Sequence, residues 1–339
     1  MSARVESSWQ QVYTLLMPDG ISRPPARTLR TAKALVAAGL LPAARLEDAA
    51  QVAARYAIAV SATMAGQITA PDDPVGLQFL PDAAELITAA HETTDPIADE
   101  ALSPLPGIVH RYPDRVLLKP LLACPVYCRF CFRREQVGPD GGVLSPDALE
   151  TAYDYIAARP AIREVILTGG DPLILSPRRL GEILRRIEAI PHVEWLRIHS
   201  RVPVADPTFV TDALLAALDI EKPLYLAVHA NHAQEFTAAA RAALHQLNRL
   251  GLPLLGQTVL LAGVNDSETA LAALFRTMLR ARIKPYYLHQ LDAAPGTAKF
   301  HVPIARGREI LANLRGTLSG MAFPTYILDR PGGLGKIPL

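Results

Sequence analysis

The chain has 339 residues, half of them hydrophobic, and a formal net charge of +1. This length allows one large domain or a barrel with an added region, with ample apolar residues for a core. The near-neutral charge, without a basic tract interleaved with aromatics, argues against a nucleic-acid partner. No run approaches the roughly 20 apolar residues of a membrane span. The N-terminal MSARVESSWQQ lacks a secretory signal pattern, so we expect a cytoplasmic protein.

Residues 1–105 are predicted to form a helical N-terminal region that packs against the rest of the chain. Segments 28–41 and 47–68 are rich in alanine and repeat their apolar residues at a helical period. Proline clusters such as the one at 71–74 interrupt this pattern. Residues 101–114 are broken by prolines and lead into the next part of the chain.

From Arg115 onward, short apolar segments alternate with helix-period segments, which is typical of parallel β/α units. Strands are predicted at 116–121, 164–167, 195–199, 224–229, 254–260 and 285–289. Helices are predicted between them, at 146–160, 177–191, 212–219, 235–251 and 267–283. Six units fall short of the eight that close a barrel, so residues 106–320 are predicted to form a partial (β/α)6 barrel, an α/β fold. Residues 321–339 are predicted to form a short C-terminal tail.

Polar and glycine-rich residues follow each predicted strand. They are the cysteine loop, Thr168 to Pro172, His199 to Arg201, His229 with Asn231 and His232, Gln257, and Asp292. The carboxyl ends of parallel strands in such barrels carry the chemistry, so one mouth should collect these residues. Any one of these residues, and an isolated histidine above all, would be interpreted as a turn or cap residue, but their coincidence after six strands outweighs that interpretation.

The three cysteines, Cys124, Cys128 and Cys131, lie within eight residues in a CxxxCxxC pattern. A disulfide framework would need an even number of cysteines and an oxidising compartment. A structural zinc site would need a fourth ligand, such as His110, His199 or His229. Three thiolates without a fourth favour an iron–sulfur cluster that leaves one iron open to a substrate or cofactor.

The cysteine loop, with Phe130 before its last cysteine, resembles that of the radical S-adenosylmethionine (SAM) enzymes. There a 4Fe-4S cluster binds SAM and donates one electron to cleave it. Six further segments narrow the resemblance to the lysine 2,3-aminomutase family: HRYPDR at 110–115, TGGDPL at 168–173, IHSR at 198–201, QTVLLAGVND at 257–266, PYYLHQLD at 285–292 and LDRPGGLGK at 328–336. The resemblance implies an isomerase that converts L-lysine to β-lysine by amino-group migration, with pyridoxal phosphate (PLP) as a further cofactor.

In that family a lysine in a glycine-rich motif binds PLP covalently, and the matching residue is Lys336. The flexible backbone around it would come from Gly332, Gly333 and Gly335. A phosphate-binding P-loop is the alternative interpretation, but it needs Ser or Thr after the lysine, where Ile337 stands. The resemblance also assigns PLP contacts to the HRYPDR segment, and we expect them from Arg111, Tyr112 and Arg115.

For substrate binding, the resemblance matches Arg133 to the α-carboxylate of lysine, and Asp292 and Asp329 to its ε-ammonium. Two carboxylates at one site need a cation, which lysine supplies and glutamate does not. SAM contacts are predicted for a set of polar and glycine residues after the strands: Gly169, Gly170, Asp171, Ser200 and Gln257.

The residues alone leave several points open. The expected partners are L-lysine and a one-electron reductant such as a flavodoxin or ferredoxin. In long family members, a segment that follows the matching lysine contributes to oligomer contacts. The residues therefore leave the oligomeric state of this chain open, and a homo-oligomer is one of the alternatives. Short members resemble the enzyme that makes (R)-β-lysine for elongation factor P, so the product could serve translation or metabolism. The rival hypotheses are an aminomutase for another amino acid and a zinc-binding structural protein.

Overall fold

The computed structural model describes residues 27–139, 141–331 and 335–339. Its centre is a nine-stranded sheet whose strands follow one another in space in the order of the chain. Strands β2 to β8 are parallel, while β1 and β9 pair antiparallel at the two edges. The strands are β1 Ile108–Tyr112, β2 Arg115–Leu121, β3 Glu164–Gly169, β4 Trp195–Ser200, β5 Leu224–His229, β6 Leu254–Val259, β7 Ile283–His289, β8 Thr325–Asp329 and β9 Lys336–Pro338.

The predicted partial α/β barrel is confirmed, since the six predicted strands correspond to β2 to β7. The sequence interpretation missed β1, β8 and β9. The first forms a hairpin with β2 across Pro113 and Asp114, and β8 and β9 form a second hairpin beside β7. The segments that carry HRYPDR and the C-terminal lysine therefore form the two edges of the sheet. Edge strands this short carry little periodicity, which explains why the sequence did not reveal them.

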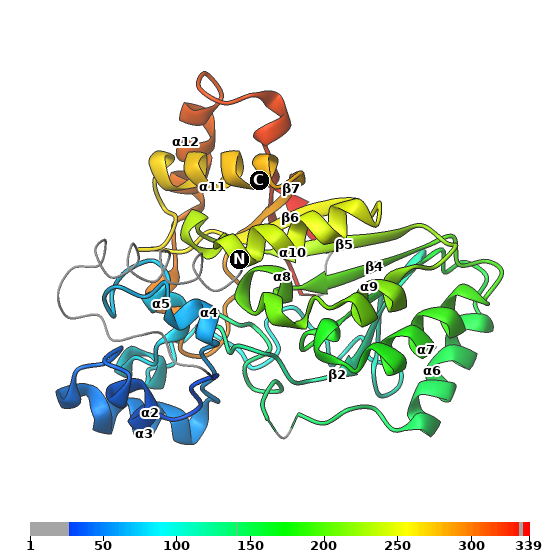
Figure 1. The fold of residues 1–339 in the computed structure, drawn as a ribbon, viewed down its shortest axis with the longest axis horizontal. Coiled ribbons are helices and arrows are strands. Elements are labelled where there is room, and N and C mark those ends of the chain that lie inside the picture. Colours follow the sequence, from blue (N-terminus) through cyan, green and yellow to red (C-terminus); the bar gives the residue numbers. More distant parts are fainter. Residues whose placement is uncertain (1–26, 140, 332–334) are drawn as a thin grey trace, which may run out of the picture.

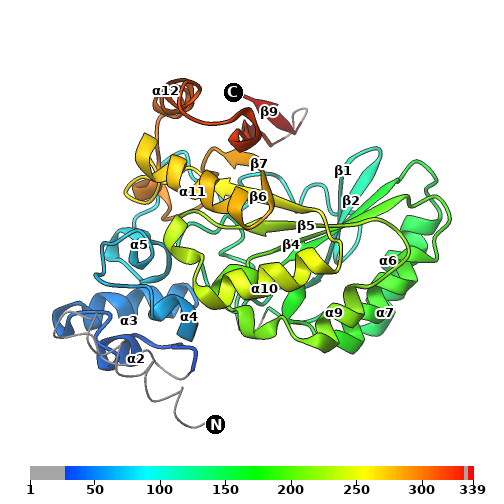
Figure 2. The same cartoon turned by 45° about the horizontal axis from the view of Figure 1, so that its top comes forward.

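The longer helices cover the outer face of the curled sheet (Figures 1 and 2). They are α6 Pro146–Ala157, α7 Pro177–Glu188, α9 Asp212–Leu218, α10 Ala238–Arg249, α11 Glu268–Arg280 and α12 Ile304–Leu314. Five of them are capped by a side chain that accepts a hydrogen bond from a backbone amide of the first turn: Ser145, Ser176, Thr211, Thr237 and Ser267. Leucine, isoleucine and valine side chains from these helices and the strands form the main core.

The N-terminal region forms a smaller lobe beside the sheet (Figure 1). Its helices are α2 Ala32–Ala37, α3 Leu46–Arg55, α4 Ala62–Ala65 and α5 Gly76–Phe79. The helical pattern predicted over 47–68 is interrupted, because Val60 instead pairs with Leu29 in a β-bridge and Ser61 caps α4. The lobe has its own apolar core, which includes Val126 of the cysteine loop. It therefore supports that loop directly.

Within the described ranges, no helix is both long and apolar enough to cross a membrane. The N-terminal segment MSARVESSWQQ, on which the prediction about a signal sequence rests, lies outside those ranges.

Candidate active site at the carboxyl ends of the strands

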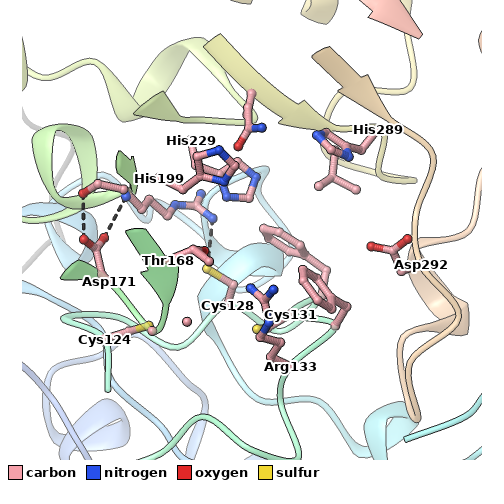
Figure 3. A pocket seen from close by; sticks show the side chains of 18 of the residues that line it. Cys124, Cys128, Cys131, Arg133, Thr168, Asp171, His199, His229, His289 and Asp292 are labelled. Carbon is pink, nitrogen blue, oxygen red and sulfur yellow. Dashed lines mark hydrogen bonds between the residues drawn. The ribbon is translucent and has the colours of Figure 1, made fainter. Parts of the chain in front are cut away.

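The cysteine loop follows β2 and lines a cavity of about 230 Å³ at the carboxyl ends of the strands (Figure 3). Backbone hydrogen bonds connect this loop to the N-terminal lobe. Tyr127 N donates to Ala59 O at 3.0 Å, and Arg129 N donates to Gln78 O at 2.8 Å. These bonds fix the loop between the lobe and the barrel, so that the three cysteines face a common space.

The glycines of TGGD make close approach of the cysteine loop possible. A Cβ on Gly170 would lie 2.1 Å from Ala123 O, and Gly169 has φ +108°. Asp171 N in turn donates to Ala123 O at 2.9 Å. Both glycines line the cavity, and packing already explains why glycine is needed there. Their contact with SAM stays a prediction.

A buried ion-pair network stands behind the cysteine loop. The Glu85 carboxylate accepts bonds from Arg129 Nε at 3.0 Å and Arg129 Nη2 at 2.6 Å, and it also contacts Arg134 Nη2. Glu85 and Arg129 are 0% and 1% exposed. Burial opposes the charged form of Glu85, but Arg129 and Arg134 hold its pKa below the ordinary value. The sequence interpretation missed these residues, although Arg129 and Arg134 lie within and just after the cysteine motif.

A further buried arginine, Arg201, contacts one of the three cysteines. Arg201 Nη1 lies 3.0 Å from Cys128 Sγ, and Arg201 Nη2 lies 2.6 Å from Glu235 Oε2. Gln78 also accepts from this guanidinium, at 2.5 Å. A positive charge beside a sulfur favours the thiolate form that metal binding requires.

The three thiols are free, and burial raises the pKa of each, that of Cys131 to about 11. Among the described residues, no three His, Cys, Asp or Glu side chains converge on a point that could hold one metal ion. One zinc ion needs four ligands at about 2.0–2.3 Å, whereas a 4Fe-4S cluster spreads its thiolates over separate irons. His110, one suggested zinc ligand, lines neither cavity of the site and is bonded to Tyr155. The donor set therefore suits a cluster better than zinc.

Asp171 and Ser200, two predicted SAM ligands, are bonded to each other. Ser200 Oγ donates to Asp171 Oδ1 at 2.7 Å, and the backbone amides of Arg201 and Val202 donate to Oδ2 at 2.7 and 3.1 Å. Burial raises the pKa of Asp171 despite these bonds. This carboxylate thus joins the end of β3 to the end of β4. Gln257, the third of these predicted SAM ligands, lies in β6 and lines the cavity, and its contact with SAM stays a prediction.

Lys336 lies at the start of β9, beside Asp329 at the end of β8. Its Nζ is 2.8 Å from Asp329 Oδ2, and Arg111 Nη1 contacts the other carboxylate oxygen. The Lys336 amide donates to the Tyr112 hydroxyl at 3.0 Å. These contacts link β1 to β8 and β9 across the open side of the sheet. Gly332 and Gly333, predicted to give this lysine flexibility, lie outside the described residues.

A second cavity, of about 340 Å³, adjoins the first on the side of β1. Arg111, Tyr112 and Arg115 line it as a group, and the Arg115 guanidinium stacks 3.7 Å from the centre of the Tyr112 ring. The residues that line both cavities are Ile97, Leu117, His199, Gln257, Asp329 and Lys336. The lysine therefore stands where the cysteine-lined cavity meets the arginine-lined cavity. Guanidinium groups such as those of Arg111 and Arg115 are the kind of donor that binds phosphate.

The two predicted substrate aspartates differ in their partners. Burial alone would raise the pKa of Asp329, but Lys336 and Arg111 lower it below the ordinary value. The side chain of Asp292 has no hydrogen bond or ion pair to any described residue, and burial and Asp329 raise its pKa to about 7. Asp329 thus already has cationic partners in Lys336 and Arg111, whereas Asp292 has none among the described residues.

Three histidines line the cysteine-lined cavity: His199, His229 and His289 (Figure 3). Burial lowers the pKa of each, that of His289 to about 3, so all three are neutral at neutral pH. Nε2 of His199 is buried without a partner among the described residues. These three histidines lie on strands and line one cavity, which agrees with the prediction that the residues at the strand ends share one mouth rather than serve as separate turn or cap residues. His232 is a cap residue, because its ring accepts a hydrogen bond from Gln234 N.

Comparison with known proteins adds relatives of known activity. A model of the radical SAM superfamily matches residues 118–275. The L-lysine 2,3-aminomutase of Acetoanaerobium sticklandii is 42% identical over 269 residues, covering 79% of this chain and 65% of that protein. The L-lysine 2,3-aminomutase of Escherichia coli K12 is 39% identical, covering 79% and 78%. The glutamate 2,3-aminomutase of Clostridioides difficile is 38% identical, covering 79% and 63%. The chain thus spans just under two thirds of the Acetoanaerobium and Clostridioides proteins.

Proposed function

The chain belongs to the lysine 2,3-aminomutase family of the radical SAM superfamily, and we propose that it is an L-lysine 2,3-aminomutase. The reaction moves the α-amino group of L-lysine from C2 to C3 and yields β-lysine, an isomer of the substrate. The observation that carries this proposal is the half-buried carboxylate of Asp292, which has no hydrogen bond or ion pair to a described residue and lines the same cavity as Arg133. A cavity with one free carboxylate and one guanidinium suits an amino acid that has a cationic side chain.

The residues of the two cavities fit the cofactors that the family implies. Cys124, Cys128 and Cys131 would hold a 4Fe-4S cluster with one iron open to SAM. When bound, the cluster and SAM supply a radical that removes a substrate hydrogen, and PLP supplies the conjugated carbon that carries the migrating nitrogen. The start of this reaction needs one electron, so the proposal includes a reductant such as a flavodoxin or ferredoxin.

The second cavity supports a PLP site. Arg111, Tyr112 and Arg115 offer guanidinium and hydroxyl donors to a phosphate. Lys336, at the junction of the two cavities, offers the amine. The Lys336 ammonium must lose its proton before it can act as a nucleophile, and Asp329 is the carboxylate beside it.

In the cysteine-lined cavity, Arg133 would bind the α-carboxylate and Asp292 the ε-ammonium of lysine. If Lys336 gives its amine to PLP, Asp329 loses the ammonium that now neutralises it. The substrate ε-ammonium can then replace that charge, so both aspartates would share it, as expected from the sequence. This exchange would replace one cation beside Asp329 by another, while Arg111 keeps its contact with the same carboxylate.

Glutamate is the alternative substrate, because one relative is a glutamate 2,3-aminomutase. Its second carboxylate would lie near Asp292 and Asp329 in a buried site, which is unfavourable for like charges. Asp292 therefore favours lysine over glutamate.

The test is a competition between the two amino acids. Protein purified anaerobically and reconstituted with iron and sulfide is given SAM, PLP, dithionite and equal amounts of L-lysine and L-glutamate. Chromatography with mass spectrometry should find β-lysine, and Cys131→Ser should form neither β-lysine nor 5′-deoxyadenosine. Formation of β-glutamate with lysine unconsumed would overturn the substrate assignment. Release of 5′-deoxyadenosine with neither product would also overturn it, while keeping radical SAM chemistry.

A further inference from the structure

The guanidinium of Arg133 is held by an acidic residue from the N-terminal lobe. Asp99 Oδ2 accepts from Arg133 Nε at 2.8 Å and lies 2.7 Å from Arg133 Nη2. Arg133 is 9% exposed and Asp99 is 3% exposed, so water screens this pair little. Asp99 is remote in sequence from the cysteine loop and belongs to no motif that pointed to it.

We propose that Asp99 is a positioning residue, which orients Arg133 to receive the carboxylate of the amino-acid substrate. This inference rests on the proposed function, in which Arg133 binds that carboxylate. The geometry of the guanidinium supports it. Asp99 uses one oxygen to engage the edge formed by Nε and Nη2. The end formed by Nη1 and Nη2 has no other acceptor among the described residues, and Arg133 lines the cysteine-lined cavity.

A planar guanidinium can bind two carboxylates at once, one on each edge. Asp99 therefore does not take the place of the substrate. It fixes the plane and direction of the donors, which otherwise depend on a side chain with several rotatable bonds. Stacking of Arg133 over the Phe132 ring, 4.4 Å from its centre, restricts the same plane.

The segment that carries Asp99 is itself held in place. Asp95 Oδ1 accepts from Asp99 N at 2.7 Å, and the Ile97 carbonyl accepts from Arg111 Nη2. Between Ile97 and Asp99, Ala98 has φ +57°, a left-handed conformation that is costly for alanine. A backbone held in this conformation brings the Ile97 carbonyl to Arg111 and the Asp99 side chain to Arg133. The segment thus connects the arginine of each cavity.

The test compares two ligands that differ only at the carboxylate, L-lysine and L-lysinamide. Binding to protein that carries its cluster and PLP is measured calorimetrically without SAM, so that no turnover occurs. Asp99→Ala should weaken L-lysine binding about tenfold, because the oriented charge-assisted contact is lost, and should change L-lysinamide binding less than about twofold. Asp99→Glu should restore most of the affinity for L-lysine. Glu100→Gln is the matched control, since it removes a neighbouring but exposed carboxylate.

The outcomes separate this inference from the proposed function. If the starting protein does not bind L-lysine, or if Arg133→Met does not reduce its preference for L-lysine over L-lysinamide, the proposed function fails. If that preference depends on Arg133 but Asp99→Ala leaves it unchanged or strengthens L-lysine binding, Asp99 is not a positioning residue. Equal losses for both ligands would also overturn the inference, because they indicate a general structural effect. Asp99→Asn, which keeps the side-chain volume, repeats the test if Asp99→Ala does not fold.

Discussion

Lys336 and Asp329 lie opposite each other in the register of β8 and β9, with Lys336 Nζ 2.8 Å from Asp329 Oδ2. Arg111 of β1 contacts the same carboxylate, so the ion pair joins both edges of the curled sheet. The amine proposed to bind PLP therefore lies in an ion pair at the junction of the two cavities. Its position follows from a hairpin of the terminal segment and from a tyrosine hydroxyl that holds its backbone.

Replacement of Lys336 can separate its covalent role from its charge. Lys336→Arg should keep an ion pair with Asp329 but abolish turnover, because a guanidinium does not act as the required nucleophile. Lys336→Ala should abolish turnover and also leave Asp329 with one cation fewer. Both variants should keep the iron content of the parent protein, measured after reconstitution. Turnover that still depends on PLP in Lys336→Arg would contradict the assignment.

The affinity for L-lysine should rise with pH from about 6 to about 8. The pKa of Asp292 is raised to about 7 by burial and by Asp329, against the opposing effects of Lys336 and Arg133. Only its charged form pairs with the substrate ε-ammonium, so protonation at low pH weakens binding. The cavity histidines have pKa values lowered below this range and should not contribute.

Calorimetric titration of L-lysine at several pH values checks this dependence. Asp292→Asn should bind about tenfold more weakly at about pH 8 and should lose most of the slope. A variant that retains the full slope would assign the titration to another group.

The same raised pKa of Asp292 means that the folded protein binds this proton more tightly than the unfolded chain. The free energy of unfolding should therefore fall, through the ionisation of Asp292, as the pH rises from the ordinary aspartate pKa to about 7.

Loss of Glu85 should destabilise the protein and its cysteine loop together. Glu85→Ala leaves Arg129 and Arg134 buried without their carboxylate, which should cost about 3–5 kcal/mol in the free energy of unfolding. Denaturant titration measures this change, and the iron bound after reconstitution should fall. Glu194→Gln, which breaks an exposed pair with Arg163, should change both quantities little. Similar effects of the two substitutions would refute a special role for the buried network.

A methyl group on Gly170 should displace the cysteine loop. Gly170→Ala would bring its Cβ to 2.1 Å from Ala123 O, a backbone atom that cannot move alone. We expect less iron after reconstitution and a lower midpoint of thermal unfolding. Gly138→Ala is the matched control in the same region, because a Cβ there meets nothing within 4 Å. If Gly170→Ala binds iron like Gly138→Ala, close packing of TGGD on the loop is unimportant for the cluster.

Patterns local to the sequence predicted much of this molecule. The six central strands alternate with helices at the expected periods, and the spacing of Cys124, Cys128 and Cys131 is enough to indicate their shared role. The residues predicted to contact the cluster, SAM, PLP or substrate line at least one of the two adjoining cavities. Their individual roles stay predictions.

Long-range pairing could not be predicted in the same way. Glu85 lies 44 residues before Arg129, and Asp99 lies 34 residues before Arg133, with no periodic pattern that connects them. Asp171 and Ser200 were each assigned to a ligand, yet their side chains are bonded to one another. The different states of Asp292 and Asp329 depend on Lys336 and Arg111, which come from separate strands. Such relationships follow only from how the strands meet.

Amino migration itself is tested most directly with L-lysine that carries ¹⁵N only at the α-amino group. The reconstituted protein is incubated with this substrate, SAM, PLP and dithionite, and the β-lysine is fragmented in a mass spectrometer. An L-lysine 2,3-aminomutase should give β-lysine with the ¹⁵N attached to C3 of the same molecule. The absence of β-lysine, or β-lysine whose C3 nitrogen is unlabelled, would contradict the proposed reaction.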